Sequence, residues 1–144
     1  TPMAINWLLA GYGIELTGMH IVIVGHGRLV GKPLAQLWRS SDLFVTVVDK
    51  TVDDLQKETL QADIIVTATG VAGLLTADMV NPEAVIVDAG VATDSNGLVG
   101  DVAQDVRKLP NITITPEKGG VGPLTVCALF ENVITAARKS VIAP

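Results

Sequence analysis

A glycine-rich segment directly after an apolar run is the first part of the sequence that suggests chemistry. Residues 20–24 read HIVIV, and the GHGRLVG that follows places glycines at positions 25, 27 and 31. Such glycines allow a sharp turn and a close approach of backbone N–H groups to a pyrophosphate, which the next helix N-terminus also attracts. The spacing exceeds the usual G-x-G-x-x-G by one residue, so a plain turn explains it about equally well, but the flanking elements favour a nucleotide. We therefore expect valine at Gly27 or Gly31 to abolish nucleotide binding, with a smaller effect on folding.

A charged pair follows the second predicted strand. Residues 44–48 read FVTVV, and Asp49 and Lys50 come directly after them. A carboxylate at this point of a Rossmann unit accepts hydrogen bonds from the adenosine ribose and repels a 2′-phosphate. Lys50 and Arg28 could instead attract that phosphate, and a solvated strand end is the alternative without a ligand. The carboxylate favours a ribose contact and gives a weak preference for NAD over NADP.

Small residues also follow the later predicted strands. Gly70 and Gly90 come after the buried runs at 64–68 and 84–88, where a dinucleotide could lie close to the backbone. Each glycine is equally explained as a turn former, and Asp88 could either bind loop amides or line a site. Residues 115–125 read TPEKGGVGPLT, which could hold a planar ligand against exposed amides or be an irregular connector.

The remaining reactive residue types form no catalytic or metal-binding pattern. His20 lies in a predicted strand and His26 in the glycine turn, without Cys or Asp at ligand spacing. Cys127 lies in an apolar final helix, where we predict that it packs rather than reacts. A single cysteine forms no internal disulfide and is normal for a reducing cytosol, so we expect a cytoplasmic protein.

The composition fits one domain and excludes some partners. The chain has 144 residues, of which 49% are hydrophobic and 3% aromatic, so it can bury a core rich in Val, Ile, Leu and Ala. The formal net charge of -5 argues against nucleic acid and against anionic membranes. No apolar run reaches the length of a membrane span, and no signal peptide pattern is present. The chain begins with Thr1-Pro2 rather than Met, so we expect an excised domain or a processed chain.

Predicted strands alternate with predicted helices. Apolar runs predict strands at 20–24, 44–48, 64–68 and 84–88, with shorter ones at 99–102 and 112–115. Helices are expected after Thr1-Pro2, after the glycine turn, after a capping-box pattern formed by Thr51 and Asp54, and over 124–139. This order predicts an α/β fold of the Rossmann-like, doubly wound type, with a mainly parallel sheet and helices on both faces. Residues 1–144 form a single domain in this interpretation.

Several segments, taken in order along the chain, share their pattern with one enzyme family. They are Thr1-Pro2, GHGRLVGKP, VIVDAGV, LVGDV and ITPEKGGVGPLTVCALFENV. Together they resemble the bifunctional methylenetetrahydrofolate dehydrogenase/methenyltetrahydrofolate cyclohydrolase family over nearly the whole chain, with GGVGPLT the most specific. The resemblance implies the C-terminal, NAD(P)-binding half of such an enzyme. The N-terminal catalytic domain, which carries a Tyr and a Lys, has no match here.

The resemblance also implies contacts, residue by residue. Its cofactor, NADP or NAD, would contact Gly25, His26, Gly27, Arg28, Leu29, Asp49, Lys50, Gly70 and Val91. The substrate, a tetrahydrofolate derivative, would border Gly119, Gly120, Pro123 and Thr125 together with the nicotinamide. The partners implied are the N-terminal catalytic domain and, in the full-length form, a second copy in a homodimer. No catalytic residue is implied within this chain.

Three departures from the family pattern matter. His26-Gly27 replaces Arg-Ser after the first glycine, and Asp49-Lys50 replaces His-Ser at the second strand end. Both weaken the usual preference for NADP. Glu117-Lys118 replaces Val-Pro and puts two charges beside the expected folate edge. The rival hypothesis is a stand-alone nucleotide-binding or scaffolding module without catalysis, which an upstream Tyr-x-x-x-Lys segment in the reading frame would argue against.

Overall fold

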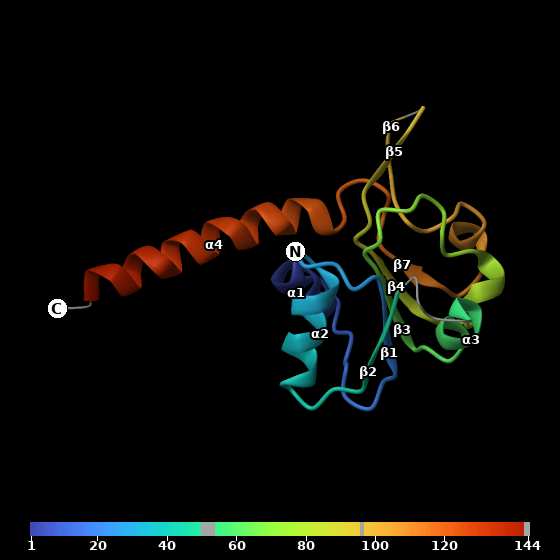
Figure 1. The fold of residues 1–144 in the computed structure, drawn as a ribbon, viewed down its shortest axis with the longest axis horizontal. Coiled ribbons are helices and arrows are strands. Elements are labelled where there is room, and N and C mark those ends of the chain that lie inside the picture. The colour runs from blue at the N-terminus through green and yellow to red at the C-terminus, as the bar shows by residue number, and fades with distance from the viewer. Residues whose placement is uncertain (50–53, 96, 143–144) are drawn as a thin grey trace.

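The buried apolar runs form neighbouring strands of one parallel sheet (Figure 1). The computed structural model describes residues 1–49, 54–95 and 97–142. The strands are β1 (Ile21–Val24), β2 (Val45–Val48), β3 (Ile64–Thr67), β4 (Val85–Asp88) and β7 (Thr113–Ile114), in the order β2-β1-β3-β4-β7. Every neighbouring pair is parallel. This confirms the predicted α/β fold of Rossmann type.

The register brings the ends of the strands to one edge. Val24 of β1 lies opposite both Val48 of β2 and Thr67 of β3, and Thr67 in turn lies opposite Asp88 of β4. Since β2 and β3 flank β1, the chain changes direction across the sheet at this point. A crevice at such a switch point, outside the carboxyl ends of the strands, is where open α/β sheets bind ligands.

Helices cover both faces of the sheet, as predicted. On one face, α1 (Pro2–Gly11) and α2 (Gly31–Arg39) pack in a core that includes Ile21, Ile23, Leu34 and Trp38. On the other, α3 (Leu55–Leu60) and the short helices η1 (Ala77–Met79) and η2 (Val106–Lys108) cover a core that includes Val22, Val24 and Ile65. Successive residues of a strand face opposite sides, so each β1 residue supports one layer or the other.

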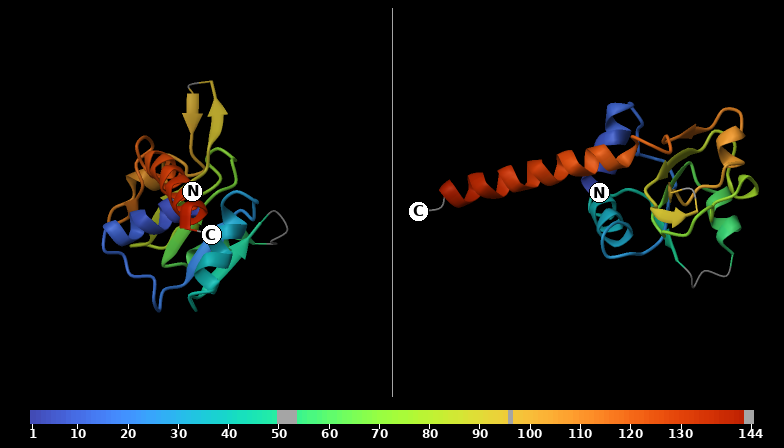
Figure 2. Two further views of the ribbon diagram at one scale, coloured as in Figure 1. Left: turned by 90° about the vertical axis from the view of Figure 1, so that its left-hand side faces the viewer. Right: turned by 90° about the horizontal axis from the view of Figure 1, so that it is seen from above.

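Two local predictions are corrected. Of the strand expected at 99–102, only Val99 belongs to a strand, in a separate antiparallel hairpin of β5 (Ala92–Asp94) and β6 (Gly97–Val99) that stands off the sheet (Figures 1 and 2). Residues after it turn back to the body, where Val102 pairs with Leu75. The capping box at α3 is also wrong in register, because Asp54 is itself the cap and accepts the Lys57 N–H at 2.9 Å. Thr51 lies outside the described residues.

The last helix, α4 (Val121–Ile142), points away from the rest of the domain (Figures 1 and 2). It starts three residues before the predicted 124, and its first turns pack on α1 through Val121 and Ala128. Cys127, between these two residues, is exposed, which corrects the prediction that it packs. In the described part of the chain, no helix joins the length and the apolar character that crossing a membrane requires.

Candidate nucleotide and substrate site

Two glycines of the turn after β1 are required by the packing of the backbone. Gly25 has φ +108°, and a Cβ atom on it would lie 2.6 Å from the carbonyl oxygen of Ala68. A Cβ atom on Gly31 would lie 1.8 Å from the carbonyl oxygen of Gly25. The start of α2 therefore sits directly on the end of β1, which in turn touches the end of β3. Gly27 differs, because its Cβ atom would meet nothing within 4 Å.

The turn leaves an open surface in front of α2. His26, Gly27, Arg28 and Leu29 are all exposed, Leu29 to 86%. The N-cap residue, Val30, has no side chain that caps the helix. The Lys32 N–H donates to the Gly27 carbonyl at 3.0 Å and Pro33 has no N–H, so the positive end of the helix dipole is what favours an anion at this position. The predicted pyrophosphate residues therefore lie together, at a place suited to a phosphate group.

The predicted ribose residue lies beside the turn. Asp49 is exposed and directly follows β2, whose last carbonyl, that of Val48, accepts the Gly25 N–H at 2.8 Å. Asp49 also has an interaction of its own within the chain. Lys50, its predicted companion, lies outside the described residues. The carboxylate thus stands next to the glycine turn, as the sequence pattern predicts.

A cleft of about 680 Å³ opens at the same edge of the sheet, over β4. It brings together Val91 and the predicted substrate residues Gly119, Gly120, Pro123 and Thr125. Its other lining residues are Thr1, Asp88, Ala89, Gly90, 97–100, 116–118, Val121 and Gly122. Glycines make up much of this lining, so the cleft presents backbone amides to whatever binds there.

The pyrophosphate and ribose residues do not line this cleft, and Gly70 lies between the two regions. Gly70 is exposed with φ +73°, and a Cβ atom on it would come within 3.4 Å of the Val91 carbonyl oxygen. The loop after β3 thus touches the loop after β4. The glycine turn, Gly70 and the cleft therefore lie next to one another along the same edge of the sheet.

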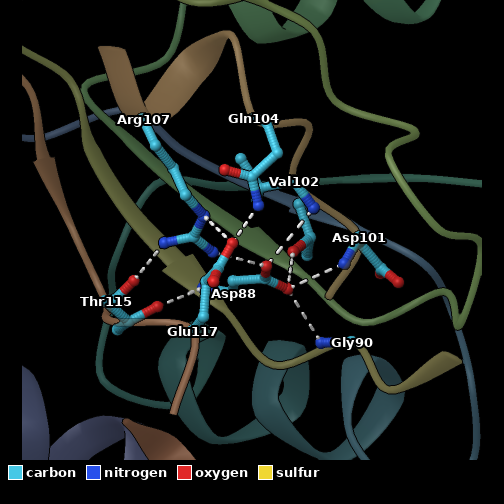
Figure 3. A network of polar contacts seen from close by, with 9 residues as sticks. Asp88, Gly90, Asp101, Val102, Gln104, Arg107, Thr115 and Glu117 are labelled. Atoms are coloured by element: carbon cyan, nitrogen blue, oxygen red, sulfur yellow. Dashed lines mark hydrogen bonds and ion pairs between the residues drawn. The ribbon is translucent and has the colours of Figure 1, made fainter. Parts of the chain in front are cut away.

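Asp88 at the end of β4 both lines the cleft and binds loop amides, so both options left open by the sequence hold (Figure 3). Its side chain is 5% exposed and accepts the N–H groups of Gly90, Asp101 and Val102 at 3.3, 3.0 and 3.3 Å. Arg107 forms an ion pair with it at 3.2 Å. The carboxylate fixes the loop that precedes η2, and the guanidinium balances its charge.

Glu117 is also drawn into this network. Its carboxylate lies 3.6 Å from Nε of Arg107 and accepts a hydrogen bond from Gln104. Arg107 also donates to the Thr115 carbonyl at 2.8 Å, so it holds both ends of the segment that enters the cleft (Figure 3). Glu117 and Lys118 both line the cleft, as predicted, and the Arg107 guanidinium is shared between the carboxylates of Glu117 and Asp88.

The sequence patterns missed Asp101, Arg107 and Gln104 as parts of the site. Asp101 is fully buried, between apolar neighbours in LVGDV, and a charge inside an apolar segment is the signal that could have identified it. Arg107 and Gln104 have no such signal, since both occupy a segment of ordinary polarity. Within the described residues, no group of three or more His, Cys, Asp or Glu side chains could hold a metal ion.

Comparison with known proteins decides the family. Residues 1–141 match the model of the tetrahydrofolate dehydrogenase/cyclohydrolase, NAD(P)-binding domain. The chain belongs to this family. Its fold and its family therefore confirm the resemblance found in the sequence motifs. The assignment of individual residues to cofactor or substrate stays a prediction.

Similar proteins include the bifunctional protein FolD of Methanosarcina acetivorans, 44% identical over 141 residues, which are 97% of this chain and 48% of that protein. The FolD of Desulforamulus reducens is 45% identical over 141 residues, 98% of this chain and 50% of that one. The chain spans about half the length of these curated relatives.

Solved structures agree. The FolD dehydrogenase/cyclohydrolase of Campylobacter jejuni superposes with a TM-score of 0.89 at 38% identity, over 96% of this chain and 50% of that one. The enzyme of Trypanosoma brucei, solved with NADP and an inhibitor, gives a TM-score of 0.87 at 36% identity, over 99% and 51%.

The structure separates two glycines that the sequence pattern predicts to behave alike. Gly31→Val is expected to lower the free energy of unfolding by more than about 2 kcal/mol, because its side chain would overlap the Gly25 carbonyl. This expectation differs from the smaller effect on folding that the sequence pattern predicts at this position. Gly27→Val should change stability by less than about 1 kcal/mol and weaken nucleotide binding, because it fills open space before α2. Urea unfolding and calorimetric titration with NAD and NADP measure both effects. Equal loss of stability in the two variants would contradict this account.

Proposed function

We propose that this chain is the cofactor-binding half of an NAD(P)-dependent methylenetetrahydrofolate dehydrogenase/methenyltetrahydrofolate cyclohydrolase of folate one-carbon metabolism. The observation that carries the proposal is that the N-terminus of α2, Gly70 and the glycine-lined cleft lie along one edge of the sheet, in a chain of this family. When bound, the nicotinamide cofactor accepts a hydride from the methylene carbon of the folate. The chain itself binds and orients the two reactants.

The residues present fit such a cofactor. Residues 25–29 would hold the pyrophosphate, since the open space at Gly27 and the N-terminus of α2 suit an anion. Asp49, with Lys50, would contact the adenosine ribose. Gly70 and Val91 would lie along the path towards the nicotinamide. Gly119, Gly120, Pro123 and Thr125 would border the nicotinamide and the folate in the cleft.

The exposed face of α4 supports a second domain as partner. Five large apolar side chains along it are 45–62% exposed, namely Val126, Leu129, Phe130, Val133 and Ile134. Their spacing of three to four residues forms one stripe on the helix. A continuous exposed apolar stripe is typical of a surface that another protein surface covers. We propose that it packs on the N-terminal catalytic domain, whose Tyr and Lys would supply the proton transfers of the cyclohydrolase step.

We also propose a homodimer for the full-length protein and a cytoplasmic location. The family resemblance supports the first, and the single cysteine supports the second. The net charge of -5 supports small-molecule substrates rather than nucleic acid or membrane surfaces as partners.

The proposed function predicts binding without turnover. The 144-residue chain should bind a nicotinamide dinucleotide yet convert no methylenetetrahydrofolate, because the sequence has no Tyr-x-x-x-Lys segment. Calorimetric titration and an absorbance assay of nicotinamide reduction measure the two properties. Activity should return when the chain is joined to the catalytic domain of a bifunctional relative. Ordinary turnover by the chain alone would contradict the division of roles, and no binding of either dinucleotide would contradict the function.

We further propose that the chain binds NAD more tightly than NADP. The Asp49 carboxylate would repel the 2′-phosphate, and unit charges about 4 Å apart interact by roughly 1 kcal/mol in water and by more in a partly buried site. Asp49→Asn should therefore shift the ratio of the two dissociation constants about five- to tenfold towards NADP.

The matched control for this comparison is Asp42→Asn. Asp42 is an exposed carboxylate with φ +58°, which Asn tolerates, and it precedes β2 at the opposite edge of the sheet. Its substitution should leave the ratio unchanged at fixed salt. Tighter binding of NADP by the natural chain would refute the preference, and an unchanged ratio in Asp49→Asn would assign the preference to another residue.

A further inference from the structure

Asp101 is a fully buried carboxylate between the loops that carry Gly70 and Val91. It has 0% exposure, and its Oδ2 accepts two hydrogen bonds, from the Thr69 N–H at 2.6 Å and the Thr69 hydroxyl at 2.9 Å. Its Oδ1 has no hydrogen-bond partner among the described residues. The ion pairs found there join Arg107 to Asp88 and Glu117, and none of them involves Asp101. A buried charge is costly unless hydrogen-bond donors stabilise it. Among the described residues, the hydrogen bonds to the Asp101 carboxylate come from Thr69.

The backbone holds Asp101 firmly in place. Its carbonyl accepts the Leu75 N–H at 3.0 Å, and the Gly100 carbonyl before it accepts the Gly73 N–H at 3.3 Å. Its own N–H donates to the Asp88 carboxylate at 3.0 Å. Since Asp88 is anchored at the end of β4, the position of Asp101 is tied to the sheet. Asp101 can therefore act as a fixed support for what it contacts.

The segment that Asp101 supports carries a predicted cofactor residue. Thr69 precedes Gly70, and the Thr69 hydroxyl also accepts the Val71 N–H at 3.1 Å. The hydroxyl and N–H of Thr69 thus fix the turn around Gly70 on both sides. Because Gly70 lies against the Val91 carbonyl, the placement of this turn also sets the gap between the loops after β3 and β4.

The Asp101 carboxylate packs closely against the loop after β4, at Gly90. A Cβ atom on Gly90 would lie 2.0 Å from Cγ and from Oδ1 of Asp101. The reciprocal contact exists at Gly100, where a Cβ atom would lie 1.9 Å from Oδ2 of Asp88. Each carboxylate thus fills the space that a side chain on the opposite loop would need. The two glycines and two carboxylates lock the loops together.

We propose that Asp101 is a positioning residue for the cofactor, which sets the turn at Gly70 through Thr69 without touching the dinucleotide. This inference rests on the proposed function, since it assumes that Gly70 lies along a bound NAD or NADP. It differs from a purely structural role, in which loss of Asp101 would lower affinity only as far as it lowers stability.

The test compares four variants of the chain by calorimetric titration with NAD and NADP and by urea unfolding. Asp101→Ala removes the acceptor for both Thr69 donors and should raise the dissociation constants about tenfold. Asp101→Asn keeps an oxygen acceptor but buries an amide against Gly90. It should lose stability yet stay within about threefold of the natural affinity. Thr69→Val removes only the hydroxyl, so its dissociation constants should lie between those of the two Asp101 variants. It takes the place of Asp101→Ala in the comparison if that variant fails to fold.

Thr59→Val is the matched control. Thr59 is a fully buried threonine in α3, and its hydroxyl donates to the Leu55 carbonyl at 3.1 Å within that helix, away from both loops. It should lose stability and keep its affinity. The proposal is supported if the variants that lose the hydrogen bonds between residue 101 and Thr69 also lose affinity, and the variants that keep these hydrogen bonds keep their affinity. It is overturned if Asp101→Ala binds normally, or if affinity follows stability through all four variants. If the natural chain binds neither dinucleotide, the proposed function fails first and this inference with it.

Discussion

The site depends on one constraint, the contact between the carboxyl ends of neighbouring parallel strands. The loops leave the sheet so close together that Gly25 has no room for a side chain against Ala68, and Gly31 has none against Gly25. This contact sets the start of α2 directly beyond β1 and leaves its N-terminus facing solvent without a side-chain cap. The geometry that makes the fold compact at this edge therefore also creates the surface suited to a phosphate.

On the β4 side of the switch point, a buried carboxylate rather than close backbone contact holds the loops in place. The Asp88 carboxylate accepts several loop amides, and Arg107 balances its charge while it also holds the segment that enters the cleft. Glycine-rich loops lose much conformational entropy when they are ordered. Hydrogen bonds to a charged acceptor are stronger than neutral ones, so one carboxylate can order several such loops. The cleft can then be lined with glycine and still have a defined shape.

The sequence predicted the parts of the structure that local patterns determine. Buried β-branched runs such as 20–24 and 64–68 can be satisfied only inside a sheet covered on both faces, so strands, parallel order and layers followed. The hairpin at 92–99 could not be predicted in the same way, because it stands off the sheet and leaves no burial pattern. The exposure of Cys127 was missed because an apolar helix pattern predicts burial but does not say whether the covering surface belongs to this chain. Asp101 and Arg107 act through partners far along the chain, which no short motif encodes.

The central claim is that one edge of the sheet, from the glycine turn to the cleft, binds the dinucleotide. Amide chemical shifts of the labelled chain during titration with NAD test it most directly. The account predicts that the perturbed amides belong to residues 25–31, to Gly70 and Val91, and to residues 117–125. Perturbation confined to the opposite edge of the sheet, where Ile14 and Pro82 line a separate hollow, would contradict it.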